Sequence, residues 1–162
     1  MTRMLQFQKL NKAVHDRKAF CCGIPELDDF LRRYAAQNQE SGSSTTHVLV
    51  DSETPTQILG FVTLSTAELD FQELSTEDLR RFPRYPVSAL RVSRLAVSQE
   101  ASGKGFGGAL LGFAVRQALK VREIAGVRIL LVDAKNNNVA GFYKHFGFKS
   151  SVNNPLILYL VV

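Results

Sequence analysis

The sequence has little cysteine and lacks any long hydrophobic run. Its only two cysteines, Cys21 and Cys22, are adjacent. A disulfide between neighbours would be strained and would close no useful loop, so free thiols are expected. No other ligand residues share a recognisable spacing with them, and no metal site is predicted. No apolar run approaches the roughly 20 residues of a membrane span, and MTRMLQFQKLNK lacks a secretory signal's apolar core, so we expect a cytoplasmic protein that spans no membrane.

The composition is that of an ordinary globular chain. With 45% hydrophobic and 22% charged residues, it excludes a mainly disordered or fibrous protein. A length of 162 residues fits one domain, predicted to cover 1–162. The net charge of +5 favours anionic partners without distinguishing among them, and a solvated basic surface remains the alternative.

Hydrophobic periodicity and turn residues predict alternating strands and helices. Strands are expected at 4–9, 47–51, 58–66, 90–97, 128–133 and 156–162, and helices at 24–39, 75–81, 105–124 and 139–145. The order is antiparallel strands, then a β-α-β unit, then a short helix and a last strand. The fold class predicted is α/β, with a mixed central sheet flanked by helices.

A glycine-rich loop separates the strand at 90–97 from the helix at 105–124. Gly103, Gly105, Gly107 and Gly108 occupy four of six positions. Without Cβ atoms the main chain can approach an anion closely, and unpaired N–H groups at a helix N-terminus favour a phosphate. Lys104 is not followed by the ending of a P-loop, and the spacing is not that of a dinucleotide fingerprint. The loop predicts a different pyrophosphate site, unless its glycines serve only a tight turn.

Two segments resemble signatures of the GNAT superfamily of N-acetyltransferases. The segment Ser102 to Gly107 is similar to the acetyl-coenzyme A loop Gln/Arg-x-x-Gly-x-Gly/Ala, with Ser102 where Gln or Arg is usual. The segment 136–148 is similar to Asn-x-x-Ala-x-x-Phe-Tyr-x-x-x-Gly-Phe, from which only Val139 departs. The change at Ser102 removes one side chain near the phosphates and leaves the backbone cradle intact.

The resemblance extends over nearly the whole chain and to one branch of the superfamily. Segments 20–31, 94–97 and 154–160 are similar to the tRNA-acetylating toxins of bacterial toxin-antitoxin pairs, a branch that also contains ordinary acetyltransferases. The implied fold is a single-domain GNAT fold. The implied reaction is direct transfer of the acetyl group of acetyl-coenzyme A to an amine, with no acyl-enzyme and no metal.

The resemblance also assigns roles to residues. The backbone of the strand end holds the pantetheine arm, and the N–H of Val97 polarises the thioester carbonyl. Tyr143 is the implied acid for the leaving thiolate. Asn136 either contacts the pantetheine or a nearby water, or forms a turn with the two asparagines after it. The implied coenzyme-binding residues are Leu95, Ala96, Val97, Ser102, Gly103, Lys104, Gly105, Phe106, Gly107, Gly108 and Asn136.

The general base and the acceptor stay open at this point. Glu68 and His47 lie on strands that reach the cleft in such a fold, but a solvated carboxylate and a surface imidazole are the alternatives. Six arginines form either a basic wall for RNA or scattered solvated charges, and we expect no aromatic side chains interleaved among them to favour base stacking. They are Arg32, Arg33, Arg80, Arg81, Arg84 and Arg91.

Three functions remain compatible with the sequence. The first is an acetyltransferase for a small-molecule or protein amine. The second is a toxin that acetylates aminoacyl-tRNA, with tRNA and a small antitoxin protein as partners. The third is a catalytically silent coenzyme A-binding module. A homodimer is a further hypothesis, because the apolar terminal strand at 156–162 would be a poor exposed edge.

Overall fold

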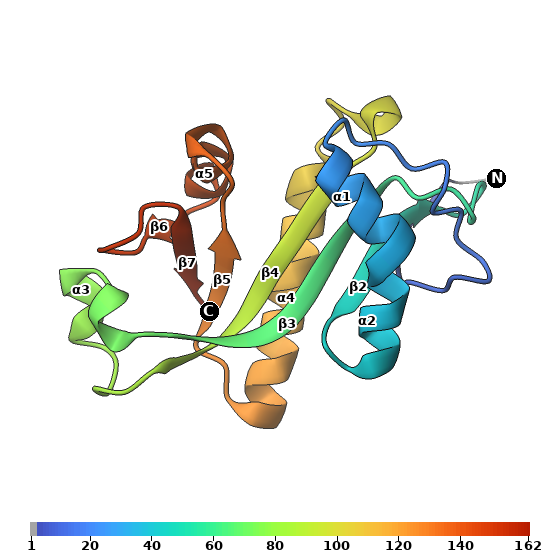
Figure 1. Ribbon diagram of the computed structural model, residues 1–162. Coiled ribbons are helices and arrows are strands. Elements are labelled where there is room, and N and C mark those ends of the chain that lie inside the picture. The colour runs from blue at the N-terminus through green and yellow to red at the C-terminus, as the bar shows by residue number, and fades with distance from the viewer. Residues whose placement is uncertain (1–2) are drawn as a thin grey trace. The chain divides into compact units, whose positions relative to one another are not determined.

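The computed structural model describes residues 3–162 as an alternation of strands and helices (Figure 1). In chain order these are β1 (Leu5–Lys9), α1 (Pro25–Asp29), the π-helical turn η1 (Phe30–Tyr34), α2 (Ala35–Ser41), β2 (Thr45–Asp51), β3 (Gly60–Leu69), η2 (Phe71–Glu73), α3 (Thr76–Leu79), β4 (Val87–Val97), η3 (Gln99–Ala101), α4 (Phe106–Ala125), β5 (Ile129–Asp133), α5 (Asn137–His145), β6 (Lys149–Ser150) and β7 (Ile157–Val161).

The strands of the described residues make one sheet in the order β1-β2-β3-β4-β5-β7-β6. β1 and β3 pair antiparallel with β2, β4 pairs parallel with β5, and β7 pairs antiparallel with β5 and β6. The sheet is therefore mixed, and the predicted α/β class is confirmed. The chain divides into two compact units, unit 1 (1–65 and 94–113) and unit 2 (66–93 and 114–162).

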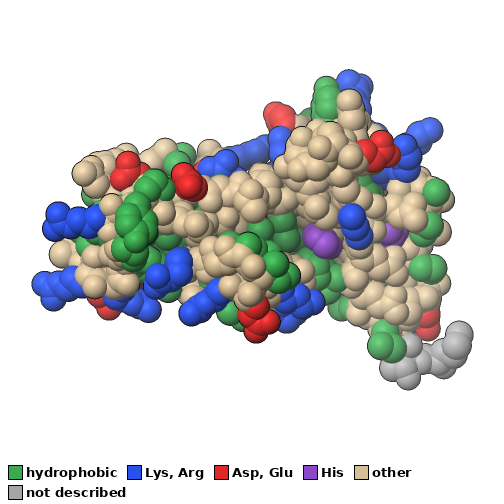
Figure 2. Space-filling model, turned by 90° about the horizontal axis from the view of Figure 1, so that it is seen from below, with side chains coloured by type: hydrophobic (Ala, Val, Ile, Leu, Met, Phe, Trp, Pro, Cys, Tyr) green, Lys and Arg blue, Asp and Glu red, His purple; other side chains and the backbone are tan. Residues whose placement is uncertain are grey.

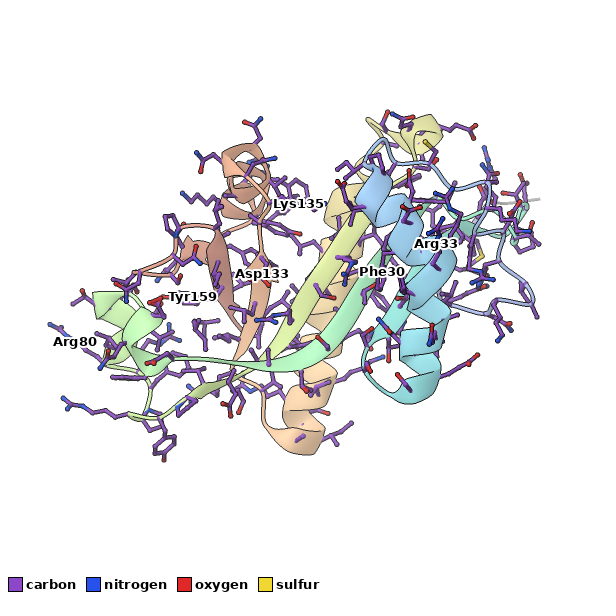
Figure 3. All side chains as sticks on the ribbon, in the orientation of Figure 1. Phe30, Arg33, Arg80, Asp133, Lys135 and Tyr159 are labelled. Atoms are coloured by element: carbon purple, nitrogen blue, oxygen red, sulfur yellow. The ribbon has the colours of Figure 1, made fainter. Side chains whose placement is uncertain are left out.

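The core of unit 1 forms between its strands and the first helical segment. The predicted helix at 24–39 is confirmed as α1, η1 and α2, and Pro25 occupies its first turn, where no N–H is needed. Leu27, Leu31 and Ala35 recur at helical spacing and are buried. Phe30, on the same segment as the exposed Arg33, stacks on Phe61 of β3 at 6.4 Å between ring centroids (Figure 3).

Gly60, at the start of β3, brings three backbone segments of unit 1 close together. A Cβ at this position would lie 2.8 Å from Cδ1 of Leu110 on α4 and 2.9 Å from the carbonyl oxygen of Ala96 on β4. Just before it, the carbonyl of Leu59 accepts a hydrogen bond of 2.8 Å from the N–H of Ser98. Gly60 thus allows β3 to pack closely against both β4, before the glycine loop, and α4, after it.

Unit 2 is centred on the buried phenol of Tyr159 on β7. The Tyr159 hydroxyl donates to Oδ2 of Asp78 at 2.7 Å and accepts from the backbone N–H of Ser75 at 2.8 Å. The Ser75 hydroxyl also accepts from the N–H of Asp78, so the predicted helix start at 75 is confirmed. Lys149 of β6 donates to the same Asp78 oxygen at 3.2 Å. This cluster fixes α3 to the C-terminal strands.

The C-terminal strand is not a sheet edge, which corrects the reasoning behind the predicted dimer. β7 pairs with β5 from Ile157 to Val161 and with β6 at Leu158 and Tyr159. The sequence analysis missed β6, because two residues are too few to show an alternating pattern. β7 is therefore not an open apolar edge, and its position does not favour a dimer.

Candidate functional site

The glycine loop of unit 1 begins in a tight turn after β4. The N–H of Ala101 donates to the carbonyl of Ser98 at 2.9 Å, and the N–H of Ser102 donates to that of Gln99 at 3.2 Å. Gly103 and Gly105 then take positive φ angles of 76° and 78°. These are left-handed conformations that only glycine adopts at little cost. Two of the four loop glycines are therefore required by the backbone itself.

The loop ends at the N-terminus of α4, where backbone donors are available. The first bond inside the helix runs from the N–H of Ala109 to the carbonyl of Gly105 at 3.2 Å. The N–H groups of Phe106, Gly107 and Gly108 precede that bond and have no partner within the helix. A Cβ built on Gly103 or Gly105 meets no atom within 4 Å, so the loop is open to a ligand. The loop fits a pyrophosphate by donor geometry and by helix dipole.

The strand end before the loop carries the other predicted contacts of unit 1. The paired register of β4 with β5 runs from Ala89 to Val92, and Leu95–Val97 follow it along β4. Ala96 is buried, while Leu95 and Val97 are half-buried. The predicted use of their backbone for the pantetheine arm stays a prediction.

Residues 21–23 brace the turn that leads into the loop, a support that the sequence analysis missed. The N–H of Gln99 donates to the carbonyl of Cys21 at 2.9 Å. A Cβ on Gly23, whose φ is 91°, would lie 2.6 Å from Nε2 of Gln99. In the sequence, only the glycine directly after Cys21 and Cys22 could have indicated that this segment supports the turn. Both cysteines are free thiols, as predicted.

Tyr143, the predicted acid, lies on α5 in unit 2. Its side chain is buried, with ring centroids 5.2 Å from Phe142 and 5.5 Å from Phe148. Burial raises the pKa of Tyr143 to about 12, so the phenol keeps its proton at neutral pH. The carbonyl of Tyr143 accepts from Phe148 at 3.2 Å, and Gly147 ends the helix with a φ of 95°. The Phe-Tyr-x-x-x-Gly-Phe signature thus builds the aromatic packing that holds the phenol.

Asn136 is the N-cap of α5. Its Oδ1 accepts a hydrogen bond of 2.9 Å from the N–H of Val139. Asn136 therefore caps a helix that contains the two asparagines after it, instead of forming a turn with them, and the amide NH₂ of this exposed side chain remains for a ligand. Asp133, the last residue of β5, pairs with Arg91 at 3.6 Å, and Lys135 lies between β5 and α5 (Figure 3).

The two candidate bases differ in environment. His47 on β2 is half-buried, with its ring centroid 4.8 Å from that of Phe113. Its pKa is lowered by burial and, to a smaller extent, by the charge of Lys9. The imidazole packs against a helix rather than lying on the surface. Glu68 is exposed on β3.

The arginines of the predicted basic wall divide between the units. Arg32 pairs with Asp29 at 3.0 Å in unit 1, whereas Arg80 and Arg84 in unit 2 are exposed. The stretch 79–99 contains five arginines and no acidic residue. Tyr85, next to Arg84, is 66% exposed, which corrects the expectation that no aromatic side chain lies among these arginines. Figure 2 shows Lys and Arg spread over one face of the molecule, with Asp and Glu among them.

Residues 3–162 contain neither a membrane-spanning helix nor a metal-binding cluster. No helix in this part of the chain is long and apolar enough to cross a membrane. No group of three or more His, Cys, Asp or Glu side chains is placed to hold a metal ion there.

Comparison with known proteins identifies the class. Residues 43–150 match the family model described as an acetyltransferase (GNAT) domain. The chain therefore belongs to the GNAT acetyltransferase family, and its fold is the GNAT fold. It is therefore an acyltransferase.

Several individual proteins are similar to this chain over most of its length. A tRNA-acetylating toxin of Mycobacterium tuberculosis is 32% identical over 91% of this chain and 86% of its own length. The structure of AtaT complexed with acetyl-methionyl-tRNAfMet has a TM-score of 0.90 at 24% identity, covering 98% of this chain and 95% of AtaT. A mutant AtaT bound to acetyl-CoA and the C-terminus of the antitoxin AtaR has a TM-score of 0.83 at 23% identity, covering 97% and 92%. The two structures show the fold.

Proposed function

We propose that this protein acetylates the α-amino group of aminoacyl-tRNA and acts as the toxin of a toxin-antitoxin pair. The observation that carries the proposal is the 32% identity to a tRNA-acetylating toxin over 91% of the chain. The proposed partners are acetyl-coenzyme A, aminoacyl-tRNA and a small antitoxin protein, and the proposed location is the cytoplasm. Residues 1–162 would act as one domain, and a homodimer stays a hypothesis.

The chemistry of the site favours an α-amine as the acceptor. An α-amino group has a pKa of about 7.7–8.0, whereas that of a lysine amine is about 10.4. A useful fraction of an α-amine is thus neutral at physiological pH without a strong base. Of the two candidate bases, Glu68 is exposed and His47 packs on Phe113. The attacking amine therefore loses its proton to water in the proposed reaction, and not to a side chain of the protein.

Each predicted site residue has a proposed step. The diphosphate of the donor lies on the N–H groups of 106–108 and on the loop 102–105, while 95–97 and the Asn136 amide hold the pantetheine. The amine attacks the thioester carbonyl, whose oxygen takes negative charge facing the N–H of Val97. The carbon-sulfur bond then breaks, and Tyr143 donates its proton to the departing sulfur.

The proton transfer from Tyr143 must be concerted with bond cleavage. The thiol of coenzyme A resembles cysteine, with a pKa of about 8.5, whereas burial raises the pKa of Tyr143 to about 12. A free thiolate is therefore too weak a base to deprotonate this phenol downhill. As the bond stretches, the phenol hydrogen-bonds the sulfur and its proton moves together with bond cleavage, after which the proton that the amine released to water returns to Tyr143.

The basic stretch of unit 2 supports an RNA acceptor. Arg80, Arg84 and Tyr85 are exposed in a stretch free of acidic residues, and an exposed aromatic ring beside cations is a platform for phosphates and an unpaired base. A protein specific for a small amine would gain nothing from such a surface.

Expression in a bacterial host tests this function. Induction should arrest growth, and mass spectrometry of nuclease-digested tRNA should detect N-acetylated aminoacyl-adenosine. Co-expression of the neighbouring small gene should restore growth. Normal growth with unmodified aminoacyl-tRNA, while the purified protein acetylates other amines, would exclude the toxin role and leave an ordinary acetyltransferase. A protein that binds acetyl-coenzyme A and transfers nothing would be the silent module.

A further inference from the structure

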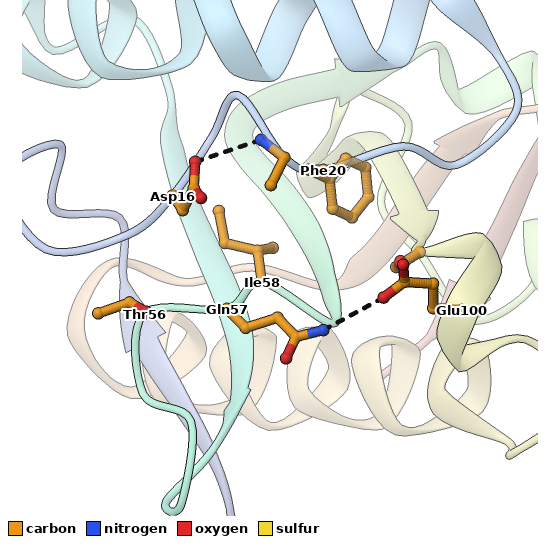
Figure 4. Close-up of a pocket in the computed structure, with 8 residues that line it drawn as sticks. Asp16, Phe20, Thr56, Gln57, Ile58 and Glu100 are labelled. Atoms are coloured by element: carbon orange, nitrogen blue, oxygen red, sulfur yellow. Dashed lines mark hydrogen bonds between the residues drawn. The ribbon is translucent and has the colours of Figure 1, made fainter.

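A pocket in unit 1 lies next to the predicted coenzyme contacts, because its lining residue Ser98 directly follows Val97 (Figure 4). None of its lining residues belongs to the set implied for acetyl-coenzyme A. The pocket is lined by Asp16, Ala19, Phe20, Thr56, Gln57, Ile58, Ser98 and Glu100. The chain segments meet through a hydrogen bond of 2.8 Å from the N–H of Asp16 to the carbonyl of Thr56.

The pocket combines an apolar floor with an acidic rim. Phe20 and Ile58 are 4% and 3% exposed, whereas Asp16 and Glu100 are exposed to solvent. In Figure 4 these two carboxylates lie on opposite sides of Ile58. No Lys or Arg lines the pocket, although the whole chain carries a charge of +5. The pocket is therefore a local negative site in a basic protein.

Both carboxylates keep one oxygen available. Oδ1 of Asp16 accepts from the N–H of Ala19 at 3.2 Å, and Oε2 of Glu100 accepts weakly from Nε2 of Gln57 at 3.4 Å. Within residues 3–162 the second oxygen of each carboxylate has no hydrogen-bond partner. These oxygens are acceptors already positioned by their neighbours.

The hydroxyl of Ser98 is a further polar group of the pocket. Ser98 is only 7% exposed, and its backbone N–H and carbonyl bond to Leu59 and Ala101. Its hydroxyl has no hydrogen-bond partner among the described residues, but the oxygen is not one of the buried unpaired polar atoms and therefore reaches solvent. The unused hydroxyl belongs to a residue that lines the pocket beside Phe20.

We propose that this pocket binds an arginine side chain of a partner protein. A guanidinium group has five N–H donors in a plane and pairs with carboxylates through two hydrogen bonds at once. Its aliphatic stem packs on Phe20 and Ile58, as such stems do on apolar surface. A metal ion would need more ligands, and this part of the described chain offers no group of three or more. The proposal does not depend on the acceptor of the acetyl group.

The test is a titration of the full chain followed by the ¹³C methyl signal of Ile58. The probe is the peptide acetyl-Gly-Arg-Gly-amide, and the matched control peptide has citrulline, which is uncharged and similar in shape. We expect a saturable shift with the arginine peptide and at least tenfold weaker binding of citrulline. Equal shifts with both peptides, or no saturable shift, would overturn the proposal.

Variants of the rim keep the fold and remove the charge. Asp16→Asn retains the oxygen that accepts from Ala19, and Glu100→Gln retains one for Gln57. The double variant should bind the arginine peptide at least tenfold more weakly, and Ser98→Ala a few-fold more weakly. Glu40→Gln, an exposed carboxylate of unit 1 that pairs with Lys12 at 2.9 Å, is the control and should bind normally.

Two further ligands define the source of the guanidinium. Agmatine carries the same group without a peptide backbone, and Mg²⁺ tests a simple cation. Agmatine should bind more weakly than the peptide, because rim contacts to the peptide backbone are missing. Equal affinity for agmatine would identify the ligand as a small guanidine and not a protein side chain. Displacement of the peptide by millimolar Mg²⁺ would identify the ligand as a metal ion.

Discussion

Tyr143 is held in place by aromatic neighbours rather than by a hydrogen bond. Phe142 and Phe148 surround its ring, and no hydrogen-bond partner for its hydroxyl exists within residues 3–162. A phenol that is packed on its sides and lacks a partner at its tip is suited to donate to a substrate atom. Its role in the reaction can therefore be separated from its role in packing.

Tyr143→Phe keeps the ring and removes only the hydroxyl. We expect kcat for acetyl transfer to fall by about 10²- to 10⁴-fold, the usual contribution of a general acid. The Kd for acetyl-coenzyme A and the melting temperature should change little. Steady-state kinetics with calorimetry and thermal unfolding measure all three. Tyr34→Phe, at a 51% exposed position of η1, is the control, and similar kcat values for the two variants would refute the assignment.

Gly105 and Gly42 form a matched pair of glycines. Both have positive φ, 78° and 81°, and a Cβ on either meets no atom within 4 Å. Substitution by alanine should cost each about 1 kcal/mol of unfolding free energy through backbone strain. Only Gly105→Ala should also weaken acetyl-coenzyme A, because only Gly105 adjoins the phosphate donors. Urea unfolding measures the stability and calorimetric titration measures the Kd for acetyl-coenzyme A. Equal Kd values for the two variants would contradict the proposal that the glycine loop binds the phosphates.

Among the elements, α3 depends on a single buried carboxylate. Burial alone would raise the pKa of Asp78, but hydrogen bonds from Tyr159, Lys149 and Ser75 outweigh it, and the pKa is lowered. The helix has only four residues, from Thr76 to Leu79, and could not persist on propensity alone. Its position is set by the charge-assisted bonds to β6 and β7.

Tyr159→Phe removes the shortest of these bonds. We expect a loss of about 2 kcal/mol of unfolding free energy, because a hydrogen bond to a charged group contributes about 1.5–3 kcal/mol. Urea denaturation measures the loss. Tyr85→Phe, at an exposed tyrosine of the same unit, should have no effect. Equal stabilities for the two variants would show that α3 does not need the Tyr159 bond.

The segment after β1 should make stability depend on pH. Nδ1 of His15 accepts from the N–H of Asn11 at 3.0 Å, and Nε2 lies 2.8 Å from Oε1 of Gln8. Protonation would abolish the first bond, and burial lowers the pKa of His15 below its usual 6.5. A lowered histidine pKa means that the unfolded state binds the proton first as pH falls.

The contribution of His15 is therefore complete above about pH 6.5 and is lost as the pH falls below that value. We expect urea midpoints of the wild-type protein to decrease between pH 7.5 and pH 5.5. His15→Gln should be less stable at pH 7.5 but should lose less on acidification. A parallel decrease in both proteins would assign the pH dependence to other groups.

The sequence predicted the helices and strands of four or more residues and missed the shorter ones. Apolar periodicity placed α4 and the helical segment after Ile24 to within a few residues, and Ser75 announced α3. β6 was invisible, because two residues show no period. The glycines of the loop indicated a phosphate site from composition alone. Its support by Gly60 and by the pairing of Gln99 with Cys21 could not be predicted, because these contacts join residues far apart in the chain.

At the scale of the whole molecule, the positive charge is compatible with the proposed aminoacyl-tRNA acceptor. The excess of five positive charges includes a 21-residue stretch with five arginines and no acid, from 79 to 99. Coenzyme phosphates need only the glycine loop and its helix N-terminus. The proposed tRNA acceptor would account for the remaining positive surface, and the relative from Mycobacterium tuberculosis is a tRNA-acetylating toxin.

The most direct test of the account is acetyl transfer from radiolabelled acetyl-coenzyme A to purified aminoacyl-tRNAs. Deacylated tRNA and free amino acids are the controls, with Tyr143→Phe beside the wild type. The account predicts label in the amide of at least one aminoacyl-tRNA, none in the controls, and a rate at least about 10²-fold lower in the variant. Label in free amino acids but in no aminoacyl-tRNA would contradict it.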